Sequence, residues 1–170
     1  MAQGAQDRER SVLVFTRVDL PVDALMGFLF PEEAAPTTCV EDIMESGVPV
    51  TISECQLTLN SIEPSERVGV PVRLGDIDGK KHQGYRCYSP KGIGIALMAG
   101  SGGKRRFSGA YRVKGGARAL SPREACRLQG QPEWAAHHHV HIHAMRHAGN
   151  AIATPLAREI GRNVESLLDK

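Results

Sequence analysis

The segment from Arg118 to Glu133, RALSPREACRLQGQPE, constrains the fold most because it carries the signals for both ends of one short helix. Ser121 can accept a hydrogen bond from the backbone N–H three residues later, and Pro122 stands at the first helical position. Glu124 can reach back to the serine N–H. Gly130 tolerates the left-handed conformation that follows a last turn, and a proline two residues later cannot continue the helix. The sequence therefore predicts a short, capped helix that begins at Pro122.

The charges are segregated along the chain, although the net charge is only +2. Residues 1–66 hold twelve acids and three arginines, whereas residues 80–118 hold ten Lys/Arg and no acid. A run of bases is usually a solvated face. An acid-free stretch of this length, with glycines between the bases, favours nucleic acid as the partner.

Composition excludes several other classes of protein. With 170 residues and 41% hydrophobic residues, the chain can form a core, and its 18 glycines and 10 prolines predict many loops. The four cysteines are scattered without a Cys-x-x-Cys spacing, so we expect neither a disulfide nor a cysteine metal framework. No apolar run approaches the roughly 20 residues of a membrane span and no signal peptide opens the sequence. We therefore expect a cytoplasmic protein.

Taken as a string, Arg-x-Leu-Ser-x-Arg-Glu-x-x-Arg-Leu-x-Gly-x-Pro, from Arg118 to Pro132, resembles motif IX of the bacterial cytosine-5 DNA methyltransferases. Two other segments follow the order of that family. QDRER at Gln6–Arg10 resembles motif VIII, and GNAI at Gly149–Ile152 resembles motif X. Residues 73–113 are similar to the target-recognition region of its small members, especially the GCGC-reading type. The resemblance covers nearly the whole chain.

The catalytic half of that family carries three motifs that this sequence lacks. They are a Gly-rich cofactor loop near Phe-x-Gly-x-Gly, a Pro-Cys nucleophile and a Glu-Asn-Val acid. We therefore expect a C-terminal subunit or fragment that does not methylate DNA alone. It would act on double-stranded DNA with a separate N-terminal methyltransferase subunit and S-adenosylmethionine.

The resemblance implies an α/β fold: the edge of a class I, Rossmann-like methyltransferase sheet plus a small glycine-rich β target-recognition domain. Residues 1–66 would end the catalytic domain, and 67–117 would form the recognition domain. Residues 118–148 would hold the motif IX helix and a His-rich connection, and 149–170 motif X and a returning helix.

Local patterns predict individual elements. Two helices are expected besides the one at Pro122: a short one within Thr38–Ser46, and a last one from Thr154–Pro155 to Leu168 with an apolar stripe. Strand-like runs occur at Ser11–Arg17, Val48–Leu59, Val70–Leu74, Tyr85–Tyr88, Ile93–Met98 and Ala110–Val113.

The resemblance assigns supporting catalytic roles near the N-terminus and a cofactor contact near the C-terminus. Gln6 and Arg8 would support the site, while Arg10 would donate to O2 of a flipped cytosine. Without the resemblance, a surface ion-pair cluster is the default reading of these residues. Asn150, with Ala151, would line the S-adenosylmethionine pocket, and a plain helix cap is the alternative role for Asn150.

The recognition region supplies the expected DNA contacts. Gln83 would fill the space of the flipped base, and Arg86 would read guanine because its fork spans O6 and N7 in the major groove. Glycines in the following loop would let backbone approach DNA, and nearby bases would hold phosphates. These are Gly102, Gly103, Lys104, Arg105, Arg106 and Lys114.

The sequence HHHVHIHAMRH after motif IX holds six of the seven histidines. In a strand, alternation would place His139, His141 and His143 on one face, where they could bind Zn²⁺ or Ni²⁺. The family has a variable connection here, and no carboxylate or cysteine lies near by. We therefore expect no dedicated metal site.

Two departures from the family pattern leave alternatives open. Ala96 stands where the family has a threonine, and Gln131 replaces an aromatic residue. They fit a relaxed specificity subunit or a decaying fragment. A non-catalytic DNA-binding module or an inactive remnant therefore remains the alternative to a working enzyme, although neither needs the motif VIII arginines or Asn150.

Overall fold

The computed structural model describes residues 38–98, 108–137 and 140–168. The predicted strand at Ser11–Arg17 lies outside this range. Eight of the predicted site residues also lie outside it: Gln6, Arg8, Arg10, Gly102, Gly103, Lys104, Arg105 and Arg106.

Six short strands and four α-helices make up the described part, with three 3-10 turns between them. The strands are β1 (Ile52–Ser53), β2 (Leu57–Leu59), β3 (Arg73–Ile77), β4 (Arg86–Tyr88), β5 (Ala110–Val113) and β6 (Gly116–Arg118). The helices are α2 (Val40–Ile43), α3 (Pro122–Leu128), α4 (His141–Asn150) and α5 (Thr154–Leu168). The 3-10 turns are η1 (Glu54–Gln56), η2 (Gln83–Tyr85) and η3 (Glu133–Ala136).

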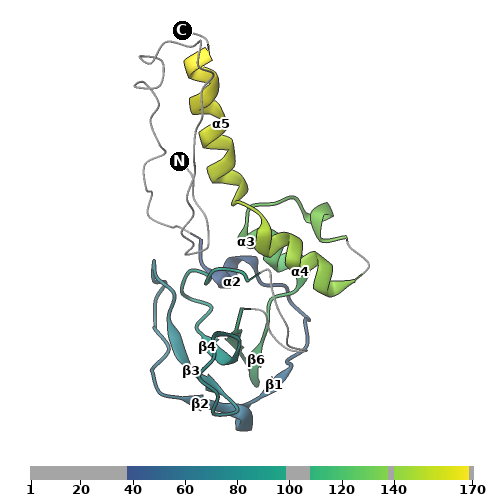
Figure 1. Cartoon of the computed structure of the whole chain (residues 1–170). Helices are drawn as coiled ribbons and strands as arrows, with labels where there is room; N and C mark the ends of the chain where they lie inside the picture. Colours follow the sequence, from purple (N-terminus) through teal and green to yellow (C-terminus); the bar gives the residue numbers. More distant parts are fainter. Residues whose placement is uncertain (1–37, 99–107, 138–139, 169–170) are drawn as a thin grey trace.

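All six strands belong to one sheet with the order β1-β6-β5-β4-β3-β2. Every neighbouring pair is antiparallel except β4 and β5, which run parallel with Tyr88 opposite Tyr111. The two edge strands, β1 and β2, are consecutive in the chain and joined only by η1. The sheet must therefore curl, and Figure 1 shows its two edges meeting at η1.

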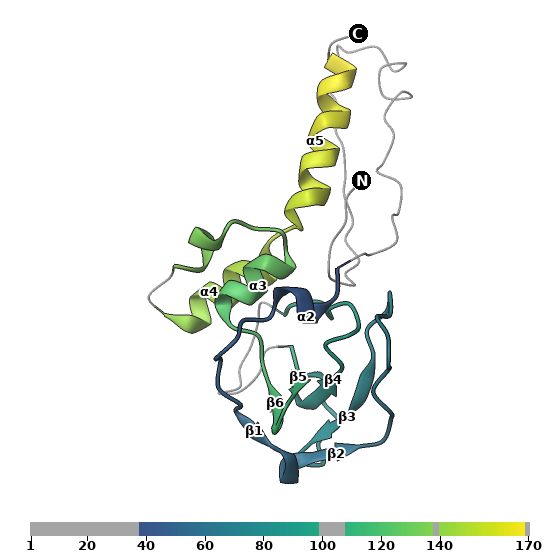
Figure 2. The ribbon, with the colours of Figure 1, turned by 180° about the vertical axis from the view of Figure 1, so that it is seen from behind.

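The helices lie at one end of the sheet. In Figures 1 and 2, α2 and α3 lie between the sheet and α5, and α5 projects away from the strands. One buried cluster joins sheet and helices and includes Val40, Tyr111, Leu120, Leu128 and Met145. A second, smaller cluster fills the curled sheet and contains Ile52, Ile77, Cys87, Ala110 and Ala117. Burial raises the pKa of the Cys87 thiol to about 11, so this cysteine stays protonated.

The structure confirms the predicted helix at Pro122. The Ser121 hydroxyl accepts from Glu124 N–H, and the Glu124 carboxylate accepts from Ser121 N–H, which completes a capping box. At the other end, Gly130 has φ +63° and donates to Arg127 O, while Gln131 N–H donates to Cys126 O. These two bonds form a Schellman motif, so glycine has the conformational role that the sequence predicted.

Three strand predictions need correction, and one strand was missed. The predicted run Val48–Leu59 is not one strand, because the turn η1 divides it into β1 and β2. The predicted strand Ile93–Met98 contributes only a bridge at Gly94, and two of its other N–H groups donate to side chains: Tyr111 Oη accepts from Ile95 and Ser108 Oγ from Met98. The predicted strand Val70–Leu74 begins too early, since the observed strand is β3, Arg73–Ile77. The strand β6 was not predicted, since Gly-Ala-Arg has no strand-like composition.

The histidine segment is also different from the strand considered above. Residues from His141 onward form the helix α4, which ends at Asn150. Asn150 therefore closes α4 and does not cap α5, whose predicted bounds of 154 and 168 are confirmed. The described helices include none that is long and apolar enough to cross a membrane.

Candidate nucleic-acid interface

The predicted base-contacting residues lie on one short segment beside the middle of the sheet. Gln83 opens η2 and Arg86 opens β4, so a single turn separates them. Both side chains are half-buried. Arg86 Nε is buried and has no hydrogen-bond partner among the described residues. Because Nε itself is buried, a ligand at this half-exposed position would meet the other donors of the guanidinium.

The two ends of the glycine-rich connection, 99–107, lie against this segment. Met98 N–H donates to Ser108 Oγ at 2.8 Å, which holds the two ends together. Gly109 follows with φ +81°, and a Cβ there would lie 2.8 Å from Arg86 O and 3.3 Å from Gln83 O. Only glycine allows this approach. The structure thus places Gly109, which follows the predicted loop in sequence, beside Gln83 and Arg86, while the predicted loop residues 102–106 lie outside the described residues.

Two lysines next to Gln83 extend the basic surface, and sequence analysis did not select them. Asp78 and Gly79 form a tight turn with φ values of 54° and 66°, which leads into exposed Lys80 and Lys81. Lys80 Nζ lies 4.7 Å from the centre of the Tyr85 ring, a cation–π contact that orients the ammonium. The Asp-Gly dipeptide ahead of Lys-Lys was the available signal, because Asp-Gly marks a two-residue hairpin turn.

Lys114 is not part of this surface. It lies in the turn between β5 and β6, about 13 Å along an extended strand from Ala110, the neighbour of Gly109. There it lines a shallow pocket of about 450 Å³ with Glu54, Glu63 and Arg112. Arg112 Nη1 donates to Glu54 at 2.7 Å, and this hydrogen bond raises the pKa of Arg112. The nearby carboxylates reduce the positive charge available for phosphate at Lys114.

The motif X residues lie at the junction of the last two helices. Ala151 N–H donates to His147 O, which ends α4, and Asn150 is exposed just before it. Asn150 does not line either of the two pockets at Lys114 and beside the junction of β6 with α3.

A buried ion pair fixes the sheet to the helices. Arg118, at the end of β6, donates through Nη1 and Nη2 to both carboxylate oxygens of Glu124 at 2.7 Å. The exposed fractions of these side chains are 3% and 0%. Glu45, in the segment that follows α2, donates its N–H to Glu124 and accepts at its carbonyl from Arg118. The junction residues Arg118, Glu124 and Glu45 thus connect three segments.

The Glu124 carboxyl stays ionised in spite of its burial. Burial on its own raises the pKa of Glu124, but hydrogen bonds from Arg118, Glu45 N–H and Ser121 N–H outweigh it and lower the pKa below 4.5. Sequence analysis assigned Glu124 a cap and missed its partner Arg118. No periodicity links a residue of β6 with a residue of α3, so only the resemblance pointed to this arginine.

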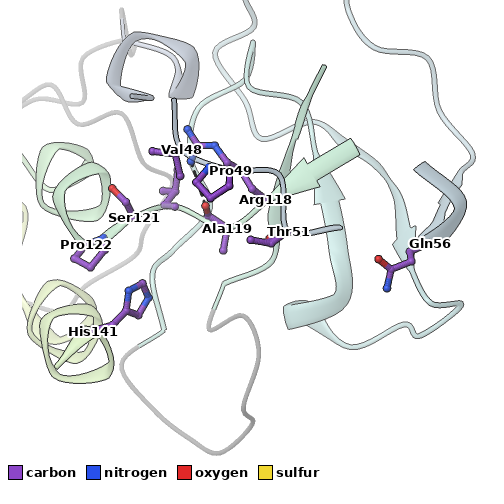
Figure 3. Close-up of a pocket in the computed structure, with 10 residues that line it drawn as sticks. Val48, Pro49, Thr51, Gln56, Arg118, Ala119, Ser121, Pro122 and His141 are labelled. Atoms are coloured by element: carbon purple, nitrogen blue, oxygen red, sulfur yellow. Dashed lines mark hydrogen bonds between the residues drawn. The ribbon is translucent and has the colours of Figure 1, made fainter. Parts of the chain in front are cut away.

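An open pocket of about 590 Å³ lies beside the junction. Figure 3 shows Ser121, Pro122 and His141 on one side of it and Pro49 and Thr51 on the other. It lies between the chain entering β1, the β6–α3 connection and the start of α4. No predicted DNA or cofactor residue lines it.

Comparison with known proteins identifies the relatives of this chain. A family model described as C-5 cytosine-specific DNA methylase matches residues 2–166. The Type II methyltransferase M.HhaI of Haemophilus parahaemolyticus is 34% identical over 167 residues. The match covers 96% of this chain and 50% of that relative, so the chain spans about half of its length.

Proposed function

Because this chain belongs to the family of C-5 cytosine-specific DNA methylases, we propose that it is the target-recognition part of a DNA (cytosine-5-)-methyltransferase. The observation that carries the proposal is the packing of Gly109 against Gln83 and Arg86. This packing gathers a half-buried guanidinium, an amide and the root of a glycine-rich loop. An exposed pair of lysines flanks them, as expected of a surface that reads bases and holds phosphates.

Each described residue would make a different contact with DNA. Arg86 would read a guanine through its two-pronged fork, and Gln83 would occupy the space left by an extruded cytosine. Lys80 and Lys81 would hold phosphates close to these base contacts. Lys114 would make a separate and weaker phosphate contact, because Glu54 and Glu63 lie beside it.

Catalysis would also use residues from both ends of the chain. Cytosine is poorly reactive at C5, so a base in this reaction must be flipped out and attacked by a thiolate at C6. Arg10 would donate to O2 of that cytosine and favour the charge that develops on the ring, with Gln6 and Arg8 as supports. S-adenosylmethionine is the methyl donor of the family, and the Asn150 amide would contact it.

A catalytic half, on this polypeptide or a separate one, would bring the cysteine nucleophile and the remaining cofactor contacts. In this arrangement the part of 1–66 that precedes β1 would complete the edge of a Rossmann-like sheet, and 67–117 would act as the recognition domain. β1 and β2 pair with strands of 67–117, so they would belong to the recognition domain as well. Motif X and α5 would pack on the catalytic sheet. The half-buried apolar stripe of α5, which includes Leu156, Ile160 and Val164, supports such a contact.

The decisive experiment combines the whole chain with the N-terminal half of a cytosine-5 methyltransferase. Transfer of labelled methyl groups from S-adenosylmethionine to DNA is measured for each half alone and for both together. We expect activity only with both halves, and a loss of at least about 100-fold with Arg10→Ala. Arg67→Ala is the matched control, because exposed Arg67 pairs with Glu41 and Asp42 away from the proposed interface.

Three results would count against the proposal in different ways. Salt-sensitive DNA binding by this chain without methylation in any combination would identify a non-catalytic binding module. Neither binding nor methylation would identify an inactive remnant. Equal losses with Arg10→Ala and Arg67→Ala would remove the catalytic role given to Arg10.

A further inference from the structure

Helix α4 places two histidines one turn apart. His143 and His147 lie four residues apart within His141–Asn150. His143 N–H donates to Val140 O, and His147 O accepts from Ala151 N–H, so both residues are held by the backbone bonds of the helix. In a continuous helix, side chains four residues apart have Cβ atoms about 5–6 Å apart.

The pair lies on the outer face of this helix. Ala144, Met145 and Ala148 are buried, and α4 packs with them against α3. His143 and His147 are both exposed. At roughly 100° per residue, they lie on the side of the helix opposite the buried residues. Both imidazoles therefore lie outside the core, and binding there does not require the core to open.

We propose that His143 and His147 form a two-histidine site for a divalent first-row transition-metal ion, such as Zn²⁺, Ni²⁺ or Cu²⁺. Neutral imidazole is a preferred ligand of these ions, with metal–nitrogen distances of about 2.0–2.1 Å for zinc. The four-residue spacing on a helix is the one that lets two histidines of a zinc protease hold one ion. Water molecules complete the coordination, so the site is open.

The helix changes the predicted ligand set. A strand would pair His141 with His143, whereas α4 turns His141 roughly 120° to 160° away from the two ligands around the helix axis. His141 instead lines the pocket beside Ser121 and Pro122 (Figure 3). This difference supplies a matched control, because all three histidines belong to the same helix and are exposed.

The test measures thermal unfolding of the whole chain, first freed of metal, with and without Zn²⁺ or Ni²⁺. A helical pair binds the folded chain in preference to the unfolded one, so bound metal raises the melting temperature. At about 100 times the dissociation constant we expect a rise of roughly 5–11 °C. His143→Ala and His147→Ala should each abolish it, and His141→Ala should retain it.

Binding by the histidine tract as an unstructured peptide gives a different result. Such binding occurs in the folded and unfolded chain alike, so it leaves the melting temperature unchanged. Isothermal titration of the same variants adds a second measurement, with at least a tenfold weaker affinity expected for His143→Ala and His147→Ala only. No metal-dependent stabilisation, or an equal loss in His141→Ala, overturns the proposal. The test uses neither DNA nor cofactor, so it stands apart from the proposed methyltransferase function.

Discussion

Charged side chains are buried and paired at the junction, whereas they are exposed or half-buried at the candidate interface. At the junction, Arg118 and Glu124 are buried and each makes several hydrogen bonds within the protein. At the interface, Lys80 and Lys81 are exposed, and Arg86 Nε has no partner among the described residues. A charge whose bonds are all made inside the protein can only hold the structure. An exposed charge can bind a ligand, so substitutions in the two regions should have separable effects.

The largest effect is expected at the junction. Arg118→Met leaves Glu124 buried without its cation, and breaking a buried pair in this way costs about 3–5 kcal/mol of unfolding free energy. Denaturant unfolding of the whole chain measures the loss. The double variant Arg118→Met/Glu124→Leu removes both charges and should recover much of it. A loss below about 1 kcal/mol for the single variant would contradict the structural role of the pair.

Gly109 tests whether the interface also depends on close backbone packing. Gly109→Ala puts a Cβ at φ +81°, 2.8 Å from Arg86 O, so strain and displacement of β4 should together cost about 1–3 kcal/mol. Gly115→Ala is the control, because Gly115 has φ +86° with nothing within 4 Å. We expect the control to lose stability only and Gly109→Ala to lose DNA affinity as well. Equal DNA affinities of Gly109→Ala and Gly115→Ala would show that Gly109 does not contribute to the interface.

Arg86 and Lys114 should differ in what they contribute to DNA binding. Arg86→Lys keeps the charge but loses the fork, so discrimination at one guanine should fall by about 1–3 kcal/mol. Lys114→Ala should weaken binding to all sequences alike and reduce the salt slope by about 1 or less. Competition binding with a panel of DNA duplexes, repeated at several salt concentrations, measures both. A loss of DNA affinity in Lys114→Ala that depends on the DNA sequence would contradict the phosphate contact assigned to Lys114.

The smallest effect is expected from acid, and only at the junction. The pKa of Glu124 is lowered in the folded protein, so its contribution is fully present above the ordinary value of 4.5 and is lost as pH falls through the folded pKa. Glu133 also has a lowered pKa, from its hydrogen bond with Arg127, but it is exposed and contributes less. Unfolding free energy measured from pH 7 down to 3 should therefore fall less steeply in Glu124→Gln. Identical slopes would show that another acid dominates.

Local signals predicted the helical part of the molecule well. Ser121, Pro122, Glu124 and Gly130 specify the two ends of α3 through contacts within the helix itself, and the structure has all of them. The bounds of α5 followed in the same way from a proline near its start and an apolar stripe. Both cases depend on neighbours in sequence, which a pattern can show.

The strands and the interface depend on contacts between residues that lie far apart in the sequence, which local patterns do not show. Gly116 belongs to β6 because it fits beside Ile52 O, which a Cβ would approach to 2.0 Å. Ile93–Met98 forms no strand of the sheet, and two of its N–H groups donate instead to the side chains of Tyr111 and Ser108. Likewise, the resemblance named Gln83 and Arg86, but the sequence did not reveal that Gly109 packs against them. The outcome for Arg10 and for residues 102–106 lies outside the described residues and remains a prediction.

The parallel pairing of β4 with β5 has a consequence for how recognition could diversify. Two parallel neighbours require a crossover, and here that crossover includes residues 99–107, whose ends are joined by the bond from Met98 to Ser108. Lengthening a connection between fixed ends adds little closure entropy, since a doubling costs only about 0.6 kcal/mol. The length and sequence of this segment can therefore change while β4 and β5 keep their register. Under the proposed target-recognition function, replacing this stretch alone is expected to change the DNA sequence that is recognised.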